Sequence, residues 1–223
     1  MEVYSIPGFE EPINSWSHLL GAFGFFCLVI YLLRPSGIGR KHFPFILIFG
    51  FSSVFLFSMS GVYHLLSFGG TGRFVLRVLD HAGIYVLIAG TFTAIHGILF
   101  SGFMRWGVIL VVWVLAINGI TLGTIFFTSM PEFLSLLFFL GLGWLGIVTG
   151  IMLWRKRGIY FIKYFVFGGL SYTIGAVLEF FRFPVLVNGV VGPHEIFHFA
   201  VLLGTTLHWM FIINSIKCLY QPD

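Results

Sequence analysis

The chain has 223 residues, of which 58% are hydrophobic and only 9% are charged, and its formal net charge is +4. Soluble domains carry about 25% charged residues, so this composition excludes a water-soluble globular protein and indicates an integral membrane protein. The basic residues lie in short segments between apolar runs, which favours contacts with lipid headgroups and excludes a nucleic-acid partner.

Seven apolar runs are long enough to cross a bilayer, because about 20 helical residues span its hydrocarbon core. We expect spanning helices at residues 15–33, 43–66, 79–99, 106–127, 133–154, 161–180 and 195–217. Glycine, proline and basic residues mark the boundaries between them. The sequence therefore predicts an all-α, polytopic membrane protein with seven transmembrane helices, in which residues 1–223 form a single domain.

The distribution of Lys and Arg predicts the orientation in the membrane. One side holds the loops after the first, third and fifth spans and the C-terminus, and it carries nine of the twelve basic residues. The other side carries Arg73, Arg77 and Arg182. Because basic loops stay in the cytoplasm, we expect a protein of the cell (inner) membrane with its N-terminus outside and its C-terminus inside.

Three histidines and an aspartate fall near the ends of spans on the outer side. The second span ends near His64, the third opens with Asp80, and the seventh opens with His194-Glu-Ile-Phe-His198. Residues four apart share one helix face, so His194 and His198 can present two imidazole nitrogens to one ion. Three protein ligands with one open position are typical of catalytic zinc, so we expect these three histidines to bind zinc toward the exterior face. Nickel and cobalt also suit imidazole, but zinc is the default.

Two polar residues are expected to support this site. Asp80 could orient a ligand or the water that the metal activates, or it could be the general base for that water. Ser60 lies one turn before His64, where it could form a hydrogen bond near the metal or a substrate. A single histidine or serine is more often an ordinary interfacial or packing residue. Four such features at one depth favour the metal site.

Glu11, Asn14 and His18 precede or open the first span on the same side of the membrane. With Asn14 or Ser15 as the N-cap, these residues could line the mouth of the site or bind a second cation. Helix capping combined with interfacial anchoring is an equal alternative.

Carboxylates near the last two spans have simpler interpretations. The sequence His-Glu-x-x-His matches the zincin pattern, in which the glutamate is the general base. That pattern needs a third ligand, and His208 lies ten residues beyond His198, about 15 Å along a helix axis. We therefore expect Glu195 to be a helix-start carboxylate favoured by the helix dipole. Glu179 and Arg182 are expected to form an ion pair or to contact headgroups.

Together these segments resemble the haemolysin III family, the bacterial branch of the progestin and adiponectin receptor superfamily. The matching pieces are residues 11–18 (Glu-Pro-Ile-Asn-Ser-Trp-Ser-His), Ser60-x-x-x-His64, Asp80 and His194-x-x-x-His198. The resemblance implies a seven-helix fold with zinc on the three histidines, and it implies catalytic support from Asp80 and Ser60. It also implies kinship with alkaline ceramidases, which cleave lipid amides with a zinc-activated water. Bacterial members have been linked to haemolysis and to membrane energy or fluidity homeostasis.

Three functions follow from these patterns. The leading hypothesis is a zinc-dependent hydrolase of amide or ester bonds in a membrane lipid, whose acyl chain enters between the helices. The second is a sensor or regulator of membrane state, in which zinc is structural and lipid is a ligand. The third is a haemolysin-type lytic protein, although the spans offer few polar residues for a pore. A retinal-type pump is excluded because no lysine lies in mid-span.

Overall fold

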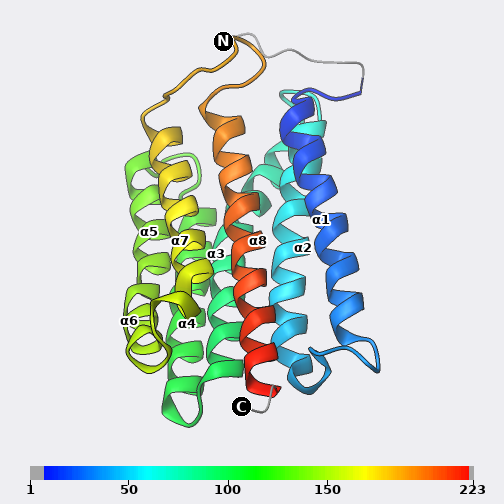
Figure 1. Ribbon diagram of the computed structural model, residues 1–223. Helices are drawn as coiled ribbons and strands as arrows, with labels where there is room; N and C mark the ends of the chain where they lie inside the picture. Colours follow the sequence, from blue (N-terminus) through cyan, green and yellow to red (C-terminus); the bar gives the residue numbers. More distant parts are fainter. Residues whose placement is uncertain (1–7, 221–223) are drawn as a thin grey trace.

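In the computed structural model, which describes residues 8–220, the chain forms a bundle of helices that run side by side (Figure 1). The helices are α1 (Pro12–Leu33), α2 (Phe43–Leu65), α3 (Thr71–Leu99), α4 (Phe103–Ile125), α5 (Glu132–Trp144), α6 (Gly146–Arg157), α7 (Ile159–Phe180) and α8 (Pro193–Tyr220), and a short 3-10 helix, η1 (Arg40–His42), precedes α2. Seven spans are long and apolar enough to cross a membrane, with α5 and α6 forming one of them. The predicted all-α class and seven spans are confirmed.

The arrangement of the helices brings distant segments to one end of the bundle. Helix α2 packs against α1 and α3, α3 against α4, and α7 against α8, while α8 also contacts α1 and α3. Figure 1 shows α8 between the α1–α2 pair and the group formed by α5, α6 and α7. The starts of α1 and α8 and the end of α2 lie at the same end of the bundle, and the end of α8 lies at the opposite one.

Small residues allow close helix packing inside the bundle. A Cβ atom added to Gly61 would come 2.7 Å from the Cγ atom of Leu19, and one added to Gly83 would come 2.9 Å from the Cδ1 atom of Leu56. These glycines bring α2 close to α1 and α3, as is common for helices in lipid. Near the far end of the bundle, the rings of Phe49 and Trp209 stack with their centroids 4.4 Å apart.

Most helices begin one to three residues before the predicted start, and α3 begins eight residues before it. Helix α1 begins at Pro12 with Glu11 at the N-cap, so the expected cap at Asn14 or Ser15 is wrong. Proline suits the first helical position, which explains the earlier start. Helix α3 begins at Thr71 instead of residue 79, because its first two turns are too polar to register as an apolar run. Asp80 therefore lies in the third turn of α3 instead of at its beginning.

The fifth span is not one continuous helix. It breaks at Leu145 into α5 and α6, and the N–H of Val148 donates to the carbonyl of Leu145 in a tighter, 3-10-like turn. Gly141, Gly143 and Gly146 surround this break. Glycine weakens a helix interior, which explains why the helix can break here. The residues around the break remain apolar, so hydropathy alone predicts a single span.

Candidate metal centre

Three histidines that are far apart in the sequence meet at one end of the bundle. His64 is the penultimate residue of α2, and His194 and His198 occupy the first two turns of α8. One ligand atom from each lies within 4.8 Å of the others, so this group could hold a metal ion. His64 and His198 are buried, and His194 is partly exposed, which leaves the group accessible from one side.

The distance between two of the ring nitrogens suits a tetrahedral ion. The Nε2 atoms of His64 and His194 lie 3.4 Å apart. Nitrogens bound about 2.05 Å from a tetrahedral centre are about 3.3 Å from each other. The ring centroid of His198 is 4.7 Å from that of His64 and 4.6 Å from that of His194. The three rings therefore surround a common point.

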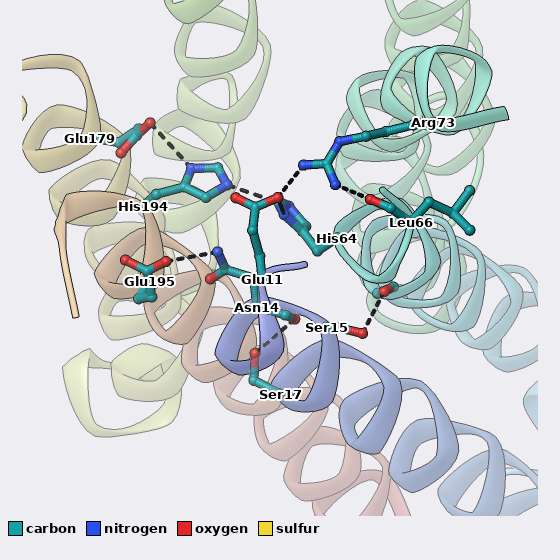
Figure 2. Close-up of polar contacts among 11 residues, drawn as sticks. Glu11, Asn14, Ser15, Ser17, His64, Leu66, Arg73, Glu179, His194 and Glu195 are labelled. Atoms are coloured by element: carbon teal, nitrogen blue, oxygen red, sulfur yellow. Dashed lines mark hydrogen bonds and ion pairs between the residues drawn. The ribbon is translucent and has the colours of Figure 1, made fainter. Parts of the chain in front are cut away.

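Glu11 fixes the orientation of His64. Its Oε2 atom accepts a hydrogen bond from Nδ1 of His64 at 2.8 Å, and it also pairs with the buried guanidinium of Arg73 (Figure 2). Burial raises the pKa of Glu11, but the hydrogen bond and charge of His64, and then those of Arg73, outweigh burial and lower the pKa to about 2. With its proton on Nδ1, His64 has a free lone pair on Nε2, as a metal ligand requires.

Arg73 is itself held in place by the chain around it. Its guanidinium donates to the carbonyl of Leu66 and lies over the rings of Phe68 and Tyr63, at 4.1 and 4.7 Å from their centroids. This arrangement ties the first turn of α3 to the end of α2. It positions the guanidinium to hold Glu11 in its ionised form.

A second carboxylate supports His194 in the same way. Oε1 of Glu179 lies 3.2 Å from Nδ1 of His194, so this ring also directs Nε2 toward the centre (Figure 2). Arg182 pairs with Glu179 and with Glu132 at the start of α5, which confirms the predicted ion pair of Glu179 and Arg182. The centre is thereby connected to α5 and α7.

His18 lies against His198, the third histidine of the cluster. Its ring stacks on that of His198 with the centroids 3.9 Å apart, and its Nε2 atom lies 3.4 Å from the carbonyl of His198. Nδ1 of His198 is buried and has no hydrogen-bond partner among residues 8–220. A buried nitrogen without a partner is costly. A metal ion bound by the three imidazoles fits this donor set, and zinc is the ion that such a set most commonly binds.

The two expected supporting residues lie in different surroundings. Ser60 is buried one turn before His64, and its Oγ atom has no hydrogen-bond partner among the described residues. Asp80 is partly exposed and lines a cavity that also contacts His194 and His198. Asp80 is not part of the three-histidine cluster.

Asn14 and Glu195 form a bridge beside the centre. The side-chain amide of Asn14 donates to Oε1 of Glu195 at 2.8 Å (Figure 2). The backbone N–H of Gly192 donates to Oε2 of Glu195 at 2.7 Å. Glu195 thus stabilises the start of α8, as expected for a helix-start carboxylate. Both of its oxygens are engaged, which disfavours the zincin role.

A large cavity extends from the centre into the bundle. Its volume is about 960 Å³, and side chains of α3 to α8 line it together with His18 of α1 and Leu56 of α2. Glu179, at the end of α7, and Ile159, at its start, both contact the cavity. They are twenty residues apart, so the cavity extends about 30 Å, close to the thickness of the hydrocarbon core. Most of its wall is apolar, which suits a hydrocarbon chain.

Sequence reasoning missed part of this arrangement. It grouped Glu11, Asn14 and His18 near the site but did not assign Glu11 to His64 or His18 to His198. It treated Arg73 only as a loop charge. The signal available for Glu11 was its position, because it is an acidic residue a few residues before an apolar span. No local signal pointed to Arg73.

Comparisons with known proteins show similarity over nearly the whole chain. The family model described as "Haemolysin-III related" matches residues 8–209. The chain is 30% identical to "Hemolysin-3 homolog" of Bacillus subtilis (strain 168), over 96% of this chain and 96% of that protein. It is 29% identical to "Hemolysin-3" of Bacillus cereus, over 92% of this chain and 90% of that protein. It is 28% identical to "Progestin and adipoQ receptor family member 3" of Homo sapiens, over 90% of this chain and 71% of that protein.

Proposed function

The chain belongs to the haemolysin-III related family, and we propose that it is a zinc-dependent hydrolase of amide or ester bonds in membrane lipids. One observation carries the proposal: a cluster of three histidines that could hold a metal ion adjoins an apolar cavity of about 960 Å³. A structural zinc site usually has four protein ligands, whereas three leave a position for a reacting group. The adjoining cavity offers room for the lipid that carries this group.

Each polar residue around the centre has a separate role in the proposed reaction. Zinc held by the three histidines would polarise a carbonyl and make water a better nucleophile. Glu11 and Glu179 hold the rings of His64 and His194 with the lone pair of Nε2 directed at the centre. Asp80, in the cavity wall, would accept the proton of the attacking water and pass it to the leaving group. Ser60 would donate a hydrogen bond beside His64.

The substrate would lie with its polar end at the centre and its hydrocarbon chain in the cavity. Asp80, Glu179 and Arg182 line the cavity together with His194, and most of the cavity wall is apolar. The orientation we propose places the centre toward the exterior face, since nine of the twelve basic residues lie on the opposite side. The substrate would then come from the outer leaflet.

Metal analysis and turnover together test this function. The purified protein should contain about one zinc per chain and cleave members of a panel of lipid amides and esters. His64→Ala should lose both the metal and the activity, because two imidazoles bind zinc weakly. His42→Ala is the matched control, since His42 lies at the opposite end of the bundle.

Cells that express His64→Ala should accumulate the intact lipid. A zinc-containing protein that cleaves no lipid, and whose loss leaves cellular lipids unchanged, would refute the hydrolase.

The second candidate is a regulator of membrane state in which zinc is structural. The network around the centre favours it, because Glu11, Arg73 and Glu179 connect α2, α3, α7 and α8. Substitution of one of the three histidines would then lower the thermal stability of the protein, and no lipid would accumulate in the cells. A lytic function would appear as conductance in planar bilayers that survives the loss of all three histidines.

A further inference from the structure

We propose that His208 forms a polar subsite deep in the cavity and selects a lipid whose chain carries a hydroxyl group. The inference rests on the proposed function in one respect, namely that the cavity holds the hydrocarbon chain. His208 belongs to α8, lines the cavity and is 4% exposed. It lies ten residues beyond His198, near the middle of the bundle. Polar residues at this depth are costly and tend to mark function.

The hydrogen bonds of His208 leave one nitrogen as a free acceptor. Nδ1 lies 2.9 Å from the carbonyl oxygen of Gly204. A carbonyl only accepts, so Nδ1 carries the proton and Nε2 presents a lone pair. Nε2 has no hydrogen-bond partner within residues 8–220. A lone pair in an apolar wall is stabilised only by a donor that enters the cavity.

The ring of His208 is held in one orientation. It stacks on Tyr172 with the centroids 5.4 Å apart and meets Phe165 edge-on at 5.6 Å. A Cβ atom added to Gly168 would come 2.7 Å from its Cε1 atom, so α7 packs directly against the ring edge. The acceptor is therefore fixed in place before any ligand binds.

Several polar groups in this part of the wall already have partners. The hydroxyl of Tyr172 lies 2.9 Å from Oγ1 of Thr205, which in turn donates to the carbonyl of Val201. Oγ1 of Thr91 donates to the carbonyl of Leu87. Unlike these groups, Nε2 of His208 is free to accept a hydrogen bond from a donor on a bound chain.

The position along the chain follows from the helix geometry. Ten residues of α8 separate His208 from the ligand His198, which is about 15 Å along the axis. An extended chain advances about 1.2 Å per bond, so the hydroxyl would lie about twelve bonds from the carbonyl at the metal. In an octadecanoyl chain this is a hydroxyl on carbon 12.

Binding of free acids tests the subsite without requiring turnover. Octadecanoic, 12-hydroxyoctadecanoic and 18-hydroxyoctadecanoic acids compete with a fluorescent fatty acid for the purified protein in nanodiscs, with and without zinc. We expect the 12-hydroxy acid to bind about three- to tenfold more tightly than the other two, as one buried hydrogen bond allows. His208→Leu should bind all three equally, and His208→Gln, which keeps an acceptor, should retain part of the preference.

The matched control is Tyr172→Phe, which alters the same wall but removes a hydroxyl that already has a partner. It should keep the preference for the 12-hydroxy acid. Wild-type protein that binds the three acids equally well overturns the inference, whether or not the variants fold, because then Nε2 contacts only water. A preference that persists in His208→Leu overturns it as well. Selective binding without lipid cleavage would refute the hydrolase and retain this subsite.

Discussion

The side-chain amide of Asn14 donates to Glu195 at 2.8 Å across 181 residues of sequence. This contact joins α1 to the first turn of α8, where His194 and His198 lie. Asn14 is fully buried and Glu195 is partly buried, so the donor end of the bond is shielded from water. The two histidines of the cluster that belong to α8 are therefore held against α1 as well as against α2.

Loss of this contact should loosen the start of α8. Asn14→Ala leaves an oxygen of Glu195 without its donor, which we expect to lower the free energy of unfolding by about 1–3 kcal/mol. Thermal unfolding in detergent measures the change. Asn118→Ala is the control, because Asn118 is exposed and bonds only within its own helix. Equal effects of the two substitutions would contradict a special role for Asn14.

Metal removal should lower the thermal stability of the protein. A ligand present at about 1,000 times its Kd stabilises the folded state by about 4 kcal/mol, and a chelator removes that contribution. We expect the Tm of the wild-type protein to fall on chelation and to recover with added zinc. The Tm of His194→Ala should not respond to either treatment. A wild-type Tm that is insensitive to chelator would contradict the metal centre.

Glu179 and Glu132 share Arg182 but should differ in their effects on the metal. Glu179→Gln removes the carboxylate that orients His194, and such changes weaken metal binding by about 10- to 100-fold. Glu132→Gln breaks only an exposed ion pair, which contributes about 0–1 kcal/mol. Competition with a metal indicator measures both variants. If Glu132→Gln weakens metal binding as much as Glu179→Gln does, the role of Glu179 is not orientation of His194.

Acid should destabilise the metal-free protein through Glu11. Its pKa in the folded protein is about 2, below the ordinary value of 4.5, so the folded state favours the ionised carboxylate. The contribution to stability is therefore complete above pH 4.5 and is lost as the pH falls toward 2. We expect the Tm of the metal-free protein to fall over this range.

Glu11→Gln should flatten that part of the pH profile, because glutamine does not titrate. Glu11→Asp, which still titrates, is the control and should keep an acid transition. An acid transition that is identical in Glu11→Gln and in the wild-type protein would assign the effect to other carboxylates.

Local patterns predicted much of this fold and part of the candidate centre. Runs of apolar residues marked seven spans, because a bilayer demands them regardless of tertiary contacts. The spacing of His194 and His198 indicated a shared ligand face, because four residues are about one helical turn. Hydropathy did not predict the first two turns of α3, because Arg73 and Arg77 reduce the mean hydropathy of residues that are nevertheless helical.

The polar support of the centre could not be predicted from local patterns. Glu11 reaches His64 across 53 residues, and Arg73 reaches Glu11 across 62. Such contacts depend on how whole helices pack, and neither periodicity nor composition encodes the pairing. The same holds for His18, which faces His198 across 180 residues.

The origin of the three imidazoles has a consequence for biosynthesis. His64 enters the membrane with the second helix, whereas His194 and His198 belong to the last one. The ribosome must therefore translate as far as α8, and the translocon must release that helix, before the three imidazoles can meet around a common point. A chain that stops before α8 would lack two of the three imidazoles and could not form the three-histidine cluster.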